Sequence, residues 1–427
     1  MSADQENSTA SQESIPKSMK AINPMTLAEV ETLMTEEAAV SELISRARQA
    51  SERWSEISLK ERSRQLIRLG ERITQERDVG ARLIAEETGR ALSLAALSEL
   101  NTVQSFIKAA ISEARIALKE TKVKLSPLDF PGKSAIVEQV PRGVIGIIAP
   151  WNYPVSNFYK SLFPALLSGN AVVMKPSEHT PRVGAWLADL ATEVLGEDLV
   201  LCVQGGASVG RALVEGGVDS VVFTGSVATG RAVAALAAHQ LIPCSLELGG
   251  KDAALVLADA DLDRTALGIA QWSMFNSGQD CSSIERLYVM DRIADSFIER
   301  LNTVISHLTY HGDGRLKPEE EADIGPLQTA EQLAVVNKHV GQAVAEGALV
   351  LCGGKPSGVG YGFQPTLLDR CVEGMLVTEE ETFGPVIAVI RVHTVDEAIE
   401  RINRSRYGLN GSVWTSNIAV GRAIAKR

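Results

Sequence analysis

The chain has 427 residues, of which 45% are hydrophobic and 22% are charged, and it carries a formal net charge of −11. This length predicts two or three domains, and the negative charge argues against nucleic acid or an anionic membrane as a partner. The five cysteines form no CxxC or Cys/His cluster. The sequence therefore predicts no metal site and no disulfide framework, and it favours a reducing, cytoplasmic compartment.

The first part of the chain changes from polar to helical and then to extended. Residues 1–24 are rich in Ser, Glu and Gln, which favours a disordered tail rather than a targeting signal. From residue 25 to residue 118, apolar residues recur at the three-and-four spacing of helices, starting at Leu27 and Val30. Residues 121–140 contain prolines and no helical period, so we expect an exposed extended ribbon.

From Arg142 to Leu257, short apolar runs alternate with amphipathic stretches of helical length. This alternation predicts buried parallel strands joined by crossover helices in a doubly wound α/β sheet. The expected strands are 144–149, 171–174, 199–203, 219–223 and 253–257, and the expected helices include 181–195 and 227–239. A second α/β pattern follows, with a helix at 261–276 and a strand at 286–290. Ligands of such sheets bind where the carboxyl ends of the strands meet helix N-termini.

Two short polar motifs directly follow the first two expected strands. In PWNYP (150–154), the Asn152 amide can donate to an oxyanion, although an ordinary proline-rich turn would have the same composition. In KPSE (175–178), a lysine and a glutamate three residues apart can bind the hydroxyls of a ribose. The alternative for this second motif is a helix start with Ser177 as its N-cap.

Three further segments carry candidate chemistry. FTGSVATG (223–230) places a glycine and a capping serine at a helix start, which favours a pyrophosphate but also suits a plain turn. ELGGK (247–251) ends a strand-like segment in a carboxylate and two glycines. Cys281 lies in the polar loop NSGQDCSS, where a cysteine can form a thiolate, whereas we interpret the other four cysteines as inert buried groups. No GxGxxG or GxxxxGK[ST] fingerprint supports a nucleotide site.

Taken together, these motifs resemble the aldehyde dehydrogenase superfamily. PWNYP, KPSE, FTGS followed by Gly230, ELGGK, GQDC and ETFGP (381–385) occur in that family's order. The resemblance implies an α/β fold with three parts. The Rossmann-type NAD-binding domain is expected to comprise 25–120 and 141–250, the catalytic domain 251–427, and the oligomerisation ribbon 121–140. It implies a homodimer or homotetramer, and because family members usually continue further, it implies that the C-terminal part of the catalytic domain is missing here.

The resemblance also implies a role for each matching residue. Cys281 is expected to attack the aldehyde, Asn152 and the Cys281 N–H to hold the oxyanion, and Glu247 to activate the water that hydrolyses a thioester. The expected cofactor ligands are Trp151, Lys175, Ser177, Glu178, Gly225, Ser226, Gly230, Leu248, Glu381 and Phe383. Because a carboxylate at position 178 is poorly placed beside a 2′-phosphate, the resemblance favours NAD over NADP.

Two positions leave the choice of aldehyde open. A lysine common in the family is replaced by Ser161, and the neighbouring Lys160 either fills its role or favours a carboxylate-bearing aldehyde. Asp280, next to the nucleophile, would instead favour an aminoaldehyde, and both residues also suit a purely structural role. Two rival functions remain: a CoA-acylating dehydrogenase, against which Glu247 argues, and a non-catalytic scaffold.

Overall fold

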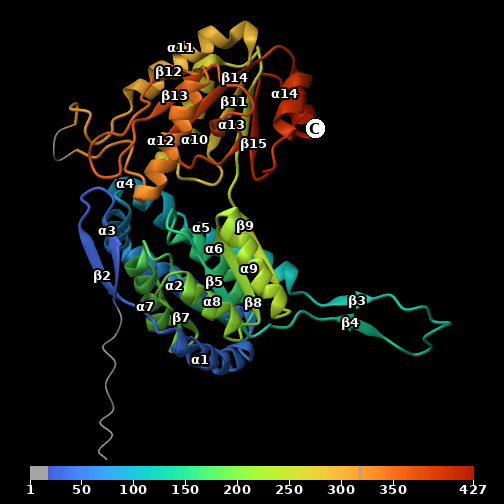
Figure 1. Cartoon of the computed structure of the whole chain (residues 1–427). Helices are drawn as coiled ribbons and strands as arrows, with labels where there is room; N and C mark the ends of the chain where they lie inside the picture. Colours follow the sequence, from blue (N-terminus) through green and yellow to red (C-terminus); the bar gives the residue numbers. More distant parts are fainter. Residues whose placement is uncertain (1–17, 317–319) are drawn as a thin grey trace, which may run out of the picture.

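A computed structural model of the chain describes residues 18–316 and 320–427. Its elements form two α/β lobes, and a long ribbon projects from the lobe that contains the first half of the chain (Figure 1). Within these described ranges, no helix is both long enough and apolar enough to cross a membrane.

The described chain begins with a β-hairpin instead of a tail followed by a helix. Strand β1 (Ser18–Ile22) pairs antiparallel with β2 (Glu29–Leu33). The prediction of a disordered tail over 1–24 is therefore wrong from residue 18 onward, while residues 1–17 lie outside the described ranges. The helical prediction is wrong over the hairpin's second strand.

The turn chemistry of Asn23 explains both errors. Its side-chain Oδ1 accepts hydrogen bonds from the N–H groups of Met25 and Thr26, each at 2.9 Å. Leu27 then takes a left-handed backbone conformation with φ of 59°. This Asx-type turn reverses the chain at the point where apolar spacing alone suggested a helix.

Helices follow the hairpin and pack beside the first sheet. They are α1 (Glu37–Ser55), α2 (Leu59–Gln75), α3 (Arg77–Thr88), α4 (Leu92–Ala95), the π-helical turn η1 (Ala96–Leu100) and α5 (Val103–Ala117). The π-turn carries Glu99, whose fully buried side chain forms an ion pair with Arg90 at 3.0 Å. Such π-turns are frequent beside functional sites.

The first lobe contains a five-stranded parallel sheet in the order β7-β6-β5-β8-β9. Its strands are β5 (Val144–Ile148), β6 (Ala171–Lys175), β7 (Val200–Cys202), β8 (Ser220–Gly225) and β9 (Cys244–Leu248), and its helices are α6 (Ser156–Leu167), α7 (Pro181–Leu195), α8 (Ala207–Glu215) and α9 (Val227–His239). The chain moves outward from β5 to β7 and then returns to the other side of β5 as β8. This reversal makes the carboxyl ends of β5 and β8 a topological switch point, where open α/β sheets bind ligands.

The second lobe contains a six-stranded sheet in the order β12-β13-β14-β11-β10-β15, parallel except for β12. Its strands are β10 (Asp252–Val256), β11 (Ile284–Met290), β12 (Leu349–Cys352), β13 (Thr366–Asp369), β14 (Val386–Val392) and β15 (Gly411–Trp414). Its helices are α10 (Leu262–Met274), the 3-10 turn η2 (Phe275–Gly278), α11 (Asp291–His307), α12 (Ala330–Ala345), α13 (Leu376–Glu379), α14 (Val395–Asn403) and α15 (Ile418–Ala425). The predicted strand at 253–257 is therefore real, and as β10 it belongs to this second sheet. The strand–helix alternation had grouped it with the first sheet, whereas the domain bounds implied by the resemblance, 251–427, had placed it in the second lobe.

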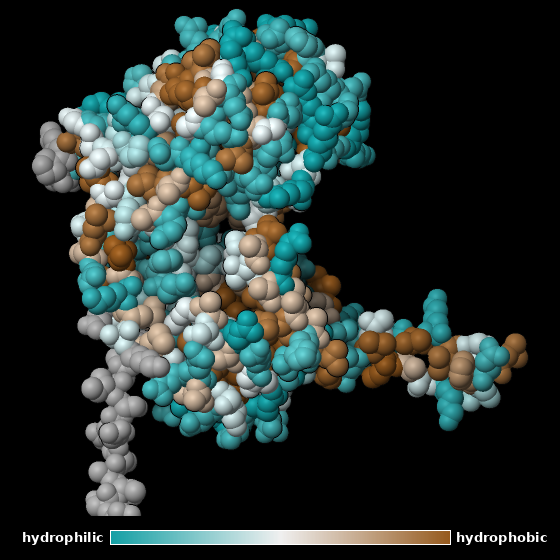
Figure 2. All heavy atoms as spheres, in the orientation of Figure 1, coloured by the Kyte–Doolittle hydropathy of each residue, from teal (hydrophilic) through white to brown (hydrophobic). Residues whose placement is uncertain are grey.

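The predicted extended ribbon is confirmed as an antiparallel pair, β3 (Thr121–Val123) with β4 (Ala135–Val137), that stands away from both lobes (Figure 1). Apolar side chains lie along it in the open (Figure 2). The exposed apolar residues of the ribbon are Val123, Leu128, Phe130, Ile136, Val137 and Val140. An apolar surface of this kind marks an interaction site.

Candidate active site

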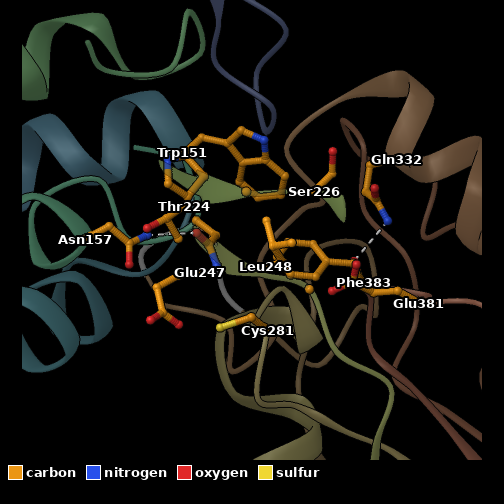
Figure 3. A pocket seen from close by; sticks show the side chains of 14 residues that line it. Trp151, Asn157, Thr224, Ser226, Glu247, Leu248, Cys281, Gln332, Glu381 and Phe383 are labelled. Atoms are coloured by element: carbon orange, nitrogen blue, oxygen red, sulfur yellow. Dashed lines mark hydrogen bonds between the residues drawn. The ribbon is translucent and has the colours of Figure 1, made fainter. Parts of the chain in front are cut away.

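A pocket opens between the two lobes, at the carboxyl ends of β5, β8 and β9 (Figure 3). Its wall from the second lobe comes from the Cys281 loop, the first turn of α12 and the loop before β14. The lining residues are Pro150, Trp151, Asn152, Asn157, Thr224, Gly225, Ser226, Glu247, Leu248, Gly249, Cys281, Gln332, Glu381 and Phe383. The pocket therefore lies at the switch point that the sheet topology indicates.

The structure brings most of the predicted site residues to this pocket. Those among its lining are Trp151, Asn152, Gly225, Ser226, Glu247, Leu248, Cys281, Glu381 and Phe383. Lys175, Ser177 and Glu178 do not line it. Lys175 is the last residue of β6, the strand that pairs with β5, and Ser177 and Glu178 follow that strand. Gly230 is also outside the lining. It packs directly against the side chain of Leu248, which does line the pocket, and a Cβ at position 230 would collide with that side chain.

The Asn152 turn is held by buried charges from the preceding helices. The Glu99 carboxylate accepts the N–H groups of Val155 at 2.7 Å and Ser156 at 3.2 Å, where α6 begins. Arg90, which pairs with Glu99, donates to the backbone carbonyl of Asn152. The Asn152 side chain is buried, and its amide donates to the carbonyl of Gln279 at 3.1 Å. One of the two N–H bonds of that amide remains available to a ligand.

The loop that leads to Cys281 has an unusual backbone. Asn276, Ser277 and Gly278 all have positive φ, at 51°, 59° and 68°. The Asn276 side-chain amide bridges this loop to the opposite lobe by donating to the carbonyls of Asn152 at 3.0 Å and Gln279 at 3.1 Å. The Cys281 N–H has no acceptor among the residues that the structure describes, so it is free to meet an oxyanion.

The thiol of Cys281 is partly buried and faces the pocket. Burial, followed by the negative charge of Asp280, raises the pKa of this thiol, and the positive charge of Lys160 acts in the opposite direction. Both carboxylate oxygens of Asp280 are engaged, by the Tyr153 hydroxyl at 2.6 Å and by the Ser282 N–H at 2.8 Å. Burial and the charge of Asp280 thus oppose formation of the thiolate in the ligand-free pocket.

Two carboxylates line the pocket in different settings. Glu247, at the end of β9, has an exposed side chain whose terminal atoms point toward the sulfur of Cys281 in Figure 3. Glu381 is held at 3.3 Å by the N–H of Gly250, and burial followed by the charge of Glu285 raises its pKa to about 7. Gly249 makes room for it, since a Cβ there would overlap the Glu381 carboxylate.

The other end of the pocket suits an anionic group. The Ser226 hydroxyl caps α9 by accepting the N–H of Thr229 at 3.2 Å, as the sequence predicts, and the start of this helix is exposed. A helix N-terminus of this kind binds phosphate well. At the end of β6, the ammonium of Lys175 donates to the carbonyls of Pro176 and Gly205 at 2.7 and 2.6 Å, which leaves one N–H for a ligand. These residues fit a dinucleotide such as NAD(P).

The helix start proposed at Ser177 is wrong. Its hydroxyl accepts the N–H of His179 at 3.2 Å within a turn, and α7 begins later, with Thr180 as its N-cap residue and a proline at the first helical position. A proline is well suited to that position because its missing N–H would have no intrahelical partner there. Ser177 therefore stays at the strand end, beside the ribose-binding candidates.

Five lining residues were not among the predicted site residues: Pro150 and Gly249, which lie within PWNYP and ELGGK, and Asn157, Thr224 and Gln332. Asn157 donates to Oδ1 of Asn152 at 3.2 Å from the first turn of α6, and its place three residues after the PWNYP motif was the signal available in the sequence. Thr224 lies within the FTGS motif itself. Gln332 donates to the carbonyls of residues 382 and 383 but belongs to an ordinary amphipathic helix, so no local pattern marks it.

Comparison with known proteins gives consistent matches over nearly the whole chain. The family model described as "Aldehyde dehydrogenase family" matches residues 10–427. A 4,4'-diapolycopene aldehyde oxidase from Methylomonas sp is 37% identical over 393 residues, which is 91% of this chain and 72% of that protein. A relative from Mycolicibacterium smegmatis, named a putative NADP(+) succinate-semialdehyde dehydrogenase, is 37% identical over 397 residues, or 90% of this chain and 74% of its own length.

Solved structures match in the same way. Lactaldehyde dehydrogenase from Escherichia coli matches with a TM-score of 0.90 and 33% identity, covering 96% of this chain and 85% of the other. The NAD+ complex of an aldehyde dehydrogenase from Bacillus cereus matches with a TM-score of 0.89 and 30% identity, covering 96% and 83%. These matches confirm the predicted fold class, and the chain belongs to the aldehyde dehydrogenase family of NAD(P)-dependent oxidoreductases.

Proposed function

We propose that the chain oxidises an aldehyde to the carboxylic acid with NAD, through a thioester on Cys281. The observation that carries this proposal is one pocket that holds a thiol, an amide donor and a carboxylate, namely Cys281, Asn152 and Glu247, next to the capped start of α9. A thiol, a water-activating base and an oxyanion donor are the groups that acyl chemistry through a covalent intermediate requires.

In the first half of this mechanism, the Cys281 thiol gives its proton to pocket water, and its sulfur forms a bond to the carbonyl carbon of the aldehyde. The electron pair of the carbonyl moves onto its oxygen, which accepts hydrogen bonds from the Asn152 amide and the Cys281 N–H. Removal of one such donor typically costs about 3 kcal/mol of transition-state stabilisation. When bound, NAD supplies the acceptor for the hydride that leaves this carbon.

In the second half, Glu247 accepts a proton from water as the water oxygen attacks the thioester carbon. The C–S bond then breaks, the acid leaves, and the proton held by Glu247 passes to the leaving sulfur, which restores both the thiol and the Glu247 carboxylate. Glu247 suits this role because it is exposed to pocket water. Glu381 is instead held against the diglycine of ELGGK, so we assign it with Phe383 to the nicotinamide ribose.

The first prediction concerns Glu247→Gln. It removes the base that serves hydrolysis but leaves the thiol, so we expect a rapid burst of NADH followed by steady-state turnover lowered roughly 10²–10⁴-fold. Stopped-flow NADH absorbance with acid quantification measures both phases, and Cys281→Ala should abolish the burst itself. Glu197→Gln on the exposed surface is the control.

Unchanged turnover without a burst would contradict the role of Glu247, and acyl-CoA formed on adding CoA would favour the CoA-acylating rival.

Lys160 favours a carboxylate-bearing aldehyde. It lies on α6 one turn beyond Asn157, exposed and outside the pocket lining, and its charge acts on the Cys281 thiol and on the Glu99 carboxylate. Asp280, the competing cue for an aminoaldehyde, is engaged at both oxygens by Tyr153 and Ser282. The Mycolicibacterium relative is named for succinate semialdehyde, which is an aldehyde of the favoured class.

For Lys160→Met, we therefore expect kcat/KM for succinate semialdehyde to fall about tenfold relative to a neutral aldehyde of similar length, equivalent to about 1.4 kcal/mol. The ratio of kcat/KM for the two aldehydes is the quantity to compare. Loss of the Lys160 charge also raises the pKa of the Cys281 thiol, and that effect is the same for both aldehydes and cancels in the ratio. Lys108→Met, on the exposed face of α5, serves as the control. Equal losses with both aldehydes would assign Lys160 to thiol activation alone.

The preference for NAD is proposed from Glu178. This carboxylate is half exposed and lies 4.0 Å from the ammonium of Lys175, where it can accept from a ribose hydroxyl and would repel a 2′-phosphate. We expect Glu178→Gln to raise the ratio of NADP to NAD kcat/KM about tenfold or more. Initial rates with both coenzymes measure the ratio, with Glu215→Gln as the control, and an unchanged ratio would remove Glu178 from coenzyme selection.

We also propose that a second copy of the chain covers the apolar face of the ribbon. Leu128 is 93% exposed and Val140 is 75% exposed, which is costly in water for large aliphatic side chains. The double variant Phe130→Asp/Ile136→Asp should therefore shift the sedimentation coefficient from that of a dimer or tetramer to that of a monomer. A wild-type protein that sediments as a monomer at micromolar concentration would contradict the proposal.

A further inference from the structure

We propose that Glu285, which does not line the pocket, is a positioning residue that holds the Thr382–Phe383 peptide in the conformation that presents the Phe383 ring to the nicotinamide end of the pocket. This inference rests on the proposed function only in assigning the cofactor to this pocket. No motif in the sequence singles out Glu285, which lies on β11 four residues after Cys281.

The peptide needs to be held because its conformation is unfavourable. Phe383 has φ of 50°, in the left-handed region that bulky L-residues rarely adopt. Such a conformation persists only where the surrounding structure imposes it. In this conformation the Phe383 ring meets the edge of Trp151 across the pocket, with ring centres 5.6 Å apart and planes at 85°. The backbone conformation at Phe383 thus sets where its ring meets Trp151.

Side chains grip this peptide from both sides. The Glu285 carboxylate accepts the N–H groups of Thr382 and Phe383, each at 2.8 Å, one on each oxygen. The Gln332 amide donates to the carbonyls of the same two residues, at 2.8 and 3.1 Å (Figure 3 draws one of these bonds). Both N–H groups and both carbonyls of this dipeptide are therefore bonded to side chains and not to a regular sheet or helix.

Glu285 is itself fixed by a buried partner. The Lys251 ammonium, from the ELGGK segment, forms an ion pair with it and also donates to the Thr382 hydroxyl at 3.0 Å. Both Lys251 and Glu285 are shielded from water, at 0% and 3% side-chain exposure, so their attraction is little screened. The pair joins the segment after Glu247, the strand after Cys281 and the loop that carries Phe383.

The test uses the double variant Glu285→Gln/Lys251→Met, which removes the carboxylate without leaving a lysine charge buried alone. In the cofactor-free protein, we expect hydrogen exchange of the Thr382 and Phe383 amides to accelerate about tenfold or more. By calorimetry, Kd for NAD should rise about tenfold, whereas Kd for ADP-ribose, which lacks nicotinamide, should stay within about twofold. The single variant Glu285→Gln, which leaves the buried Lys251 ammonium without its carboxylate partner, should show changes in the same direction that are at least as large.

The matched control is Asp369→Asn, which breaks another largely buried ion pair of the second sheet, with Arg391 at 2.8 Å, away from the pocket. It should leave the exchange of both amides and both affinities unchanged. Equal losses of NAD and ADP-ribose affinity, or unchanged amide exchange in the double variant, would overturn the positioning role. A wild-type protein that fails to bind NAD would contradict the proposed function instead, and amide exchange would still decide whether Glu285 holds the loop.

Discussion

The buried contact between Arg90 and Glu99 fixes the place where the first sheet ends and the pocket begins. Glu99 accepts the first N–H groups of α6 while Arg90 holds the carbonyl of Asn152, so the turn between β5 and α6 is tied at both ends. Leaving either charge buried alone would cost about 3–5 kcal/mol. The buried Lys251–Glu285 pair likewise holds the facing loop that carries Phe383. The pocket therefore lies between two buried ion pairs, and the loss of either partner of a pair would leave the other charge buried alone.

The two sheets contribute different things to this pocket. The first offers the ends of parallel strands and the exposed start of α9, which suit an extended anionic ligand. The second offers the thiol, on a loop whose left-handed residues turn it toward the opposite lobe. Asn276 ties the loop to Asn152 across the gap, so the nucleophile and its oxyanion donor are positioned by one hydrogen-bond network and not by two independent lobes.

Much of this arrangement could be predicted from the sequence because parallel strands bring their carboxyl ends to one edge. Polar motifs that follow buried apolar runs therefore converge, and PWNYP, FTGS and ELGGK do so. Three features were out of reach. The Asn23 turn overrides an apolar spacing that suggested a helix. The strand–helix alternation alone does not separate the strand at 253–257 from the first sheet, as the family's domain bounds do. Gln332 and Glu285 act through backbone groups of a distant loop, which leaves no local pattern.

The missing side chain at position 249 has a consequence for how natural variation in this chain is interpreted. The Glu381 carboxylate occupies the space that a Cβ at 249 would need, while the backbone of Gly249 has an ordinary negative φ. An alanine there would thus be acceptable to the local backbone, and the folding cost would be modest, yet it would displace a pocket carboxylate. A substitution at 249 is therefore better classed with active-site lesions than with folding lesions, even though glycine itself carries no reactive group.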